Sequence, residues 1–198
     1  MLPARDARLV QIVDAAVADA ARRSGSWLLC REGCTQCCIG VFPISQLDSA
    51  RLREGLATLE STDPRRAAAV RQRASESVAR LAPDFPGNSG TGIVDESSPA
   101  FEDFANDEPC PALDAATGRC DLYAARPMTC RVFGPPLRTQ EGLGVCELCY
   151  HGATEDEIAA CAVRPDPGQA ALESSLTAEA EQMTGRTGNT IVAFALLG

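Results

Sequence analysis

The chain has 198 residues, of which 45% are hydrophobic and 23% charged, so it holds enough apolar material for one ordinary hydrophobic core. Its net charge of -9 and its scattered arginines argue against the basic surface that nucleic-acid binding demands. All 18 basic residues are arginines and the only histidine is His151. These absences exclude a P-loop, a Schiff-base lysine and metal sites that need two or three histidines. Ten cysteines remain as the plentiful soft ligands.

The first predicted element is an amphipathic helix over residues 4–23, because Leu9, Val13 and Ala20 are among apolar residues that recur at helical spacing. The same stretch lacks the apolar core of a signal peptide. The longest apolar run, Ile191–Leu197, is far shorter than the roughly 20 residues of a membrane-spanning helix. We therefore expect a cytoplasmic protein with no membrane association. In a reducing compartment, clustered cysteines are metal ligands or redox groups rather than disulfides.

Two further helices are predicted to form a hairpin over residues 46–81. Ser45 and Asp48 form a capping pattern for the first of them. The second is expected to start near Pro64, after the cap candidates Thr62 and Asp63. Its many arginines are most simply interpreted as a solvated face.

Residues 83–109 are rich in Pro, Gly, Ser, Asn and acidic side chains, which predicts a long polar loop. We expect Phe101 and Phe104 to pin this loop to the body of the protein. Its most mobile part is expected around Gly87–Gly92. A loop of this kind is typical of a cover over a site.

The segment from Cys110 to Cys149 has many turn residues and no sustained hydrophobic period, which predicts irregular structure suited to ligand loops. Beyond it, Thr154 and Glu157 form a capping-box pattern at the start of a helix. Another helix is predicted over residues 170–183. Residues 190–197 are compatible with a short strand or a packed helix.

Four cysteines lie within nine residues near the N-terminal end of the chain, namely Cys30, Cys34, Cys37 and Cys38. The C-x2-C spacing of Cys34 and Cys37 lets a turn aim two sulfurs at one ion. Neighbouring side chains ordinarily point in different directions, so the adjacency of Cys37 and Cys38 favours more than one ion, or different metal atoms of one cluster.

A second set comprises Cys110, Cys120 and Cys130, spaced by nine intervening residues, followed by Cys146 and Cys149. Single thiolates on separate loops are compatible with iron–sulfur cluster ligation. A zinc site remains an alternative, since Cys34, Cys37, Cys146 and Cys149 would form two C-x2-C knuckles.

These blocks resemble the CxxCxxCC family of cysteine-cluster proteins, zinc- or iron-chelating domains often labelled iron–sulfur oxidoreductase-like. The resemblance covers roughly residues 28–150 and includes Cys110-Pro111-Ala112-Leu113, Cys120-Asp121-Leu122-Tyr123 and Arg126-Pro127-Met128-Thr129-Cys130-Arg131. It implies eight metal ligands: Cys30, Cys34, Cys37, Cys38, Cys110, Cys120, Cys130 and Cys146. Cys149 and Cys161 are then extra cysteines.

One spacing departs from the family pattern, because three residues rather than two separate Cys30 from Cys34. A bulged turn at Gly33 would absorb the additional residue, since glycine tolerates positive φ. His151 is interpreted as a surface histidine, and Cys161 as a small packed side chain.

Three further side chains lie near the second set of cysteines. Tyr123 is expected to be a packed ring whose hydroxyl bonds to the backbone. Arg126 and Arg131 would either offset thiolate charge, which raises a cluster's potential, or form ordinary ion pairs.

The sequence thus predicts a mainly α, single domain over residues 1–198, in which a small helical shell surrounds an irregular, cysteine-rich core folded around metal. The function expected first is an iron–sulfur protein in electron transfer or redox chemistry, with an unidentified redox or protein partner. The alternative is a zinc-stabilised interaction module without catalysis. No catalytic residue is assigned. We also expect the backbone order of residues 110–149 to depend on metal, while the helices over residues 4–23 and 46–81 persist without it.

Overall fold

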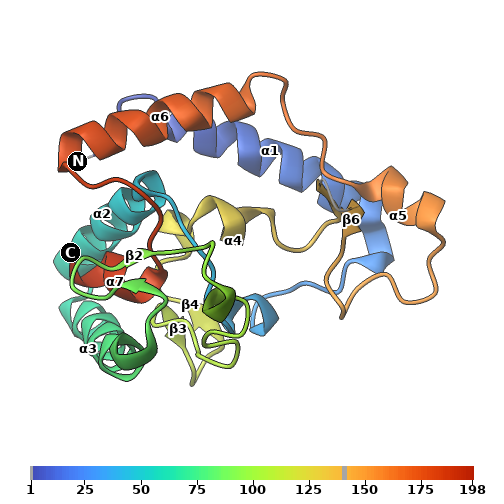
Figure 1. Ribbon diagram of the computed structural model, residues 1–198. Helices are drawn as coiled ribbons and strands as arrows, with labels where there is room; N and C mark the ends of the chain where they lie inside the picture. The colour runs from blue at the N-terminus through green and yellow to red at the C-terminus, as the bar shows by residue number, and fades with distance from the viewer. Residues whose placement is uncertain (1, 140–141) are drawn as a thin grey trace. The chain divides into compact units, whose positions relative to one another are not determined.

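The computed structural model describes residues 2–139 and 142–198, and it is built mainly from helices (Figure 1). The α-helices are α1 (Asp6–Ser24), α2 (Gln46–Thr62), α3 (Pro64–Leu81), α4 (Met128–Val132), α5 (Glu155–Cys161), α6 (Gln169–Thr184) and α7 (Val192–Leu197). Short 3-10 helices are η1 (Gly25–Trp27), η2 (Gln36–Cys38), η3 (Ala82–Asp84), η4 (Pro99–Phe101) and η5 (Tyr123–Ala125). The predicted mainly α class is confirmed.

The strands occur as three small antiparallel pairs. β1 (Gly87–Asn88) pairs with β2 (Ile93–Val94), β3 (Leu113–Asp114) with β4 (Arg119–Cys120), and β5 (Leu137–Thr139) with β6 (Gly142–Gly144). Two of these pairs lie between Cys110 and Cys149, where α4 has only five residues. The irregular structure predicted for this segment is therefore confirmed.

The chain forms two compact units. The first is built mainly from Gly33–Pro127 and Thr177–Gly198, and the second from Ala4–Glu32 and Met128–Leu176. The single domain over residues 1–198 stays a prediction. In the part of the chain that the structure describes, no helix has the length and apolar character needed to cross a membrane.

The core of the first unit lies where α2, α3 and α7 pack against one another (Figure 1). Ser45 caps α2 by accepting a hydrogen bond from the Asp48 N–H at 3.1 Å, and Asp63 caps α3 by accepting from the Arg66 N–H at 3.1 Å. The predicted helical hairpin is thus confirmed with its caps. Leu56 and Val70 are among the buried side chains between these helices.

The C-terminal segment of this unit takes the helical alternative. Thr190 exchanges two backbone hydrogen bonds with Ile44, at 2.8 and 2.9 Å, and α7 begins two residues later. This anchoring brings Val192 and Leu196 onto the α2–α3 core.

The long loop over residues 83–109 is held by aromatic packing. Phe104 is buried and meets Phe85 edge to face at 5.8 Å between ring centroids, while Phe101 is partly buried in the same cluster. Both phenylalanines therefore pin the loop as expected. Residues 87–92, expected to be its most mobile part, begin with β1 and close in a turn where the Gly92 N–H donates to the Asn88 carbonyl at 2.8 Å.

In the second unit, α1 contacts α4 and α5. The predicted N-terminal helix is confirmed, and so is the capping box of α5, made by Thr154 and Glu157. The buried Tyr150 hydroxyl donates to Ser24 Oγ at the end of α1, at 2.6 Å. These contacts form a small core that also includes Cys149 and Cys161.

Candidate metal centre

The first thiol pair of the site lies on η2, where the Cys38 N–H donates to the Thr35 carbonyl at 2.8 Å. Gly33 turns the chain just before it at a φ of +87°, as expected of the residue that absorbs the extra position after Cys30. The Cys37 and Cys38 thiols are hydrogen-bonded to each other. This interaction shows that the two neighbouring thiols lie within reach of each other. The use of this pair on more than one ion, or on different metal atoms of one cluster, stays a prediction.

The chain returns to this pair at Cys110, whose N–H donates to the Cys38 carbonyl at 2.8 Å. An antiparallel bridge between Ile39 and Pro109 fixes the same crossing. Cys120 lies on β4, paired with Leu113, which follows Cys110 by three residues. Both thiols are partly buried against the α2–α3–α7 core. The first unit therefore brings together four cysteines from segments about 70 to 80 residues apart: Cys37, Cys38, Cys110 and Cys120.

The four thiols have different acidities because their surroundings differ. The hydrogen bond from Cys38 lowers the pKa of Cys37 from 9.0 to about 6, and the Arg126 charge contributes to this shift. The same hydrogen bond, together with burial, raises the pKa of Cys38. Burial raises the pKa of Cys110 to about 12 and also raises that of Cys120. At neutral pH the cluster thus holds one thiolate, and a metal would have to displace the other protons.

The donor chemistry of this cluster fits a thiophilic metal, since sulfur ligands suit zinc and iron–sulfur clusters. Across residues 2–139 and 142–198, no three His, Cys, Asp or Glu side chains lie close enough together to hold a single ion. A bound metal would therefore have to draw the sulfurs closer than the structure places them.

The other predicted ligands are distributed over both units. Cys34 belongs to the first unit, and Cys30, Cys130 and Cys146 belong to the second. Cys30 is exposed, and the remaining three are half-buried. A methyl group added to Gly134 would lie 3.8 Å from Cys30 Sγ, so this thiol lies beside the segment that follows Cys130.

The extra cysteines and the histidine have simpler surroundings. Cys149 and Cys161 are buried in the core around Tyr150, and the Cys161 thiol donates to the Arg23 carbonyl at 3.4 Å. This contact supports a packing role for Cys161. His151 is exposed, as expected of a surface histidine.

Arg126 lies above the Tyr123 ring, with its guanidinium carbon 3.9 Å from the ring centroid. The prediction of a packed tyrosine is wrong, because Tyr123 is 64% exposed and its ring face is covered by this cation. Arg126 also lowers the pKa of Cys37 and opposes the rise at Cys120. Arg131 instead forms an ion pair in which its Nη1 donates to both carboxylate oxygens of Asp14, each at 3.0 Å. Of the two predicted uses, Arg126 offsets thiolate charge and Arg131 forms an ordinary ion pair.

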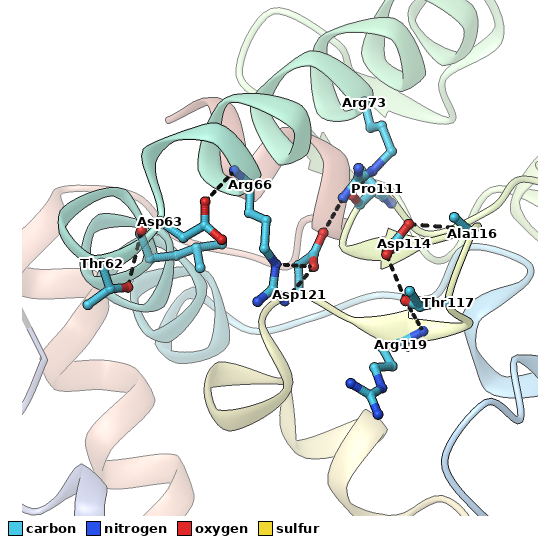
Figure 2. A network of polar contacts seen from close by, with 11 residues as sticks. Thr62, Asp63, Arg66, Arg73, Pro111, Asp114, Ala116, Thr117, Arg119 and Asp121 are labelled. Atoms are coloured by element: carbon cyan, nitrogen blue, oxygen red, sulfur yellow. Dashed lines mark hydrogen bonds and ion pairs between the residues drawn. The ribbon is translucent and has the colours of Figure 1, made fainter.

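Two arginines of α3 bond to the segment over residues 110–121, as Figure 2 shows for Arg66 and Arg73. Arg66 and Arg73 both donate to the Asp121 carboxylate, and Arg73 also donates to the Pro111 carbonyl at 2.9 Å. The face is solvated as interpreted, since the Arg66 side chain is 51% exposed, but Arg66 and Arg73 also bond to this segment. The spacing of seven residues between them, about two helical turns, was the sequence signal that could have revealed the shared face.

Comparison with known families assigns residues 29–150, more than half of the chain, to a family described as a putative zinc- or iron-chelating domain. No curated protein and no solved structure matches the chain. The match includes all eight predicted ligands, from Cys30 to Cys146, and supports metal binding without distinguishing zinc from iron. By this match, the chain belongs to the CxxCxxCC family, described as a putative zinc- or iron-chelating domain.

Proposed function

We propose that this protein binds an iron–sulfur cluster through cysteine thiolates and uses it in electron transfer or redox chemistry. The observation that carries the proposal is the backbone crossing at Cys38 and Cys110, with the β3–β4 pair, which brings four thiols near one another in the first unit: Cys37, Cys38, Cys110 and Cys120. Four thiolates are the usual ligand set of [2Fe–2S] and [4Fe–4S] clusters, whose ligands are presented by irregular loops. When bound, such a cluster would supply one-electron redox chemistry.

The surroundings of the thiols suit this role. Cys37 is the thiolate to which a metal would bind first, because its pKa lies near 6. The positive charge of Arg126 would offset part of the negative charge of the thiolates, which raises a cluster's reduction potential. Burial of Cys110 and Cys120 limits the access of water.

The proposal retains all eight cysteines that the family resemblance implies. Cys30, Cys34, Cys130 and Cys146 would supply the remaining thiolates. We place the protein in the cytoplasm, where an unidentified protein or small molecule would exchange electrons with it.

Anaerobic purification followed by iron, sulfide and zinc analysis tests the choice of metal. We expect a brown protein with sulfide-to-iron charge-transfer absorption. A colourless protein with stoichiometric zinc under the same conditions would contradict the cluster and favour the zinc-stabilised interaction module.

Cysteine variants identify the ligands. Cys110→Ala should lower the bound metal, whereas Cys161→Ala, which removes a buried thiol that bonds to the Arg23 carbonyl, should leave the metal content unchanged. Cys38→Ser should also lose metal if the four-thiol set is correct. Loss of zinc from Cys149→Ser, with Cys38→Ser unaffected, would instead indicate the two-knuckle zinc site.

A further inference from the structure

Three arginines of α3 lie on the face of the helix that contacts residues 108–121, the segment that carries Cys110 and Cys120. Arg66, Arg73 and Arg80 are each seven residues apart, which places them on one side of the helix. Each one bonds to the segment over residues 108–121. α3 therefore contacts this loop through a row of cations.

The central acceptor of the row is Asp121, whose side chain is only 5% exposed. Its Oδ1 accepts from Arg66 Nη2 at 2.6 Å and Nε at 3.0 Å, and its Oδ2 accepts from Arg73 Nη2 at 2.7 Å. Both carboxylate oxygens are thus occupied by charge-assisted hydrogen bonds (Figure 2).

The residues held in this way are direct neighbours of the thiols. Asp121 follows Cys120, and Pro111, whose carbonyl accepts from Arg73 Nε, follows Cys110. The Asp121 N–H also donates to the Ala112 carbonyl at 2.7 Å, which ties the two ends of the segment together. One arginine side chain therefore links the backbone next to one thiol with the carboxylate next to the other.

These hydrogen bonds are expected to fix the positions of the backbone next to Cys110 and Cys120 and to add little to the free energy of folding. The Arg66 and Arg73 side chains are 51% and 30% exposed, and ion pairs with an exposed partner add little to stability. Groups that orient metal ligands from outside the coordination sphere, by contrast, have large effects on metal affinity.

We propose that Arg66, Arg73 and Asp121 form a positioning clamp that presents Cys110 and Cys120 to a thiophilic metal before it binds. The inference rests on the proposed metal binding by these thiols and is independent of whether the metal is zinc or iron. The clamp reduces the rearrangement needed to gather the sulfurs, so its loss weakens metal binding while the helical core stays folded.

The test measures Zn²⁺ and Co²⁺ affinity of the full-length, reduced protein by chelator competition. We expect Arg73→Gln and Asp121→Asn each to weaken binding by at least about tenfold, as outer-shell partners typically do. Their effects should be non-additive in the double variant, because both remove the same bond. The Co²⁺–thiolate charge-transfer band should also weaken at subsaturating Co²⁺.

Arg71→Gln is the matched control. Arg71 lies on the same helix and forms an ion pair with Glu60 at 2.7 Å, and both side chains are about half exposed. Glu60 belongs to α2, so this pair lies outside residues 108–121. This variant should bind both metals like the parent. Urea unfolding of each metal-stripped variant, followed by far-ultraviolet circular dichroism, measures any change in the helical core.

Unchanged affinity in Arg73→Gln and Asp121→Asn would overturn the clamp. A loss of affinity that follows an equal loss of stability in the metal-stripped protein would also overturn it, because the residues would then be merely structural. Failure of the parent protein to bind either metal would overturn the premise that these thiols bind a thiophilic metal, and failure of the cluster itself would appear separately in the anaerobic iron and sulfide analysis.

Discussion

At the scale of single residues, the difference in pKa between Cys37 and Cys38 comes chiefly from one thiol–thiol hydrogen bond. Cys38 donates to Cys37, so the negative charge is held on Cys37 and the proton on Cys38. Two thiols with identical chemistry and adjacent positions thereby acquire different roles. The arrangement gives the cluster one nucleophilic sulfur at neutral pH.

Alkylation of the metal-stripped protein tests this assignment. The rate at Cys37 should rise with pH around a midpoint near 6, because its pKa is lowered to about 6 from 9.0. In Cys38→Ala the donor is lost and the midpoint should move up towards 9. At pH 7 this change should slow alkylation roughly fourfold, since the smaller thiolate fraction is partly offset by higher intrinsic nucleophilicity.

Mass spectrometry of the alkylated peptides gives the rate for each site. Cys110 serves as the internal control, because burial raises its pKa to about 12 and its labelling should be slow across the same range. A midpoint near 9 at Cys37 in the parent protein would contradict the hydrogen-bonded pair.

At the scale of elements, the turn that carries Tyr123 and Arg126 depends on a close approach to α2. A methyl group added to Gly55, within α2, would overlap the Ala125 Cβ well inside van der Waals contact. Glycine is otherwise unfavourable in a helix interior by about 1 kcal/mol relative to alanine. Its presence at this position therefore reflects the packing of η5 against α2.

Gly55→Ala should consequently destabilise the protein despite the gain in helix propensity. Overpacking typically costs about 1–3 kcal/mol, so we expect a net loss of up to about 2 kcal/mol in the free energy of unfolding. Urea denaturation measures it. The double variant Gly55→Ala/Ala125→Gly removes the overlap and should recover the parent stability or exceed it. A stabilised single variant would show that η5 does not pack as described.

At the scale of the whole molecule, the cysteine segments differ in how much of their order comes from packing. The segment from Cys110 to Leu122 contributes Ala112 and Leu122 to the core of the first unit, and α3 holds it through Asp121. Residues 29–33 and 144–148 consist almost entirely of exposed residues. Metal binding contributes folding free energy chiefly where such packing is missing.

Hydrogen exchange on metal-loaded and metal-stripped protein tests this difference. The structure refines the expectation that all of residues 110–149 need metal, because it divides that range between the two units. We now expect residues 110–122 to keep their protection after stripping, together with α2 and α3. Residues 29–33 and 144–148 should lose whatever protection the metal gives them. Loss of protection over residues 110–122 alone would show that the metal, and not the core, orders this segment.

Local sequence signals were sufficient for the helices. The caps Ser45, Asp63 and Thr154 each accept the hydrogen bond expected from their position, because capping depends only on residues within one turn. The motif spacing likewise identified the family and indicated metal binding, since thiolate chemistry depends on residue type and local spacing. Gly33 adopts the positive φ that the extra residue after Cys30 requires.

Only the tertiary structure decided which thiols meet and what surrounds them. The contact of Cys38 with Cys110 is a backbone crossing between residues 72 positions apart, and neither local propensity nor spacing specifies such a pairing. The arginine face of α3 could not be distinguished from a solvated surface until Asp121 was placed against it. Helices and ligand types follow from short-range interactions, whereas the assembly of the site follows from long-range packing that fixes distant segments together.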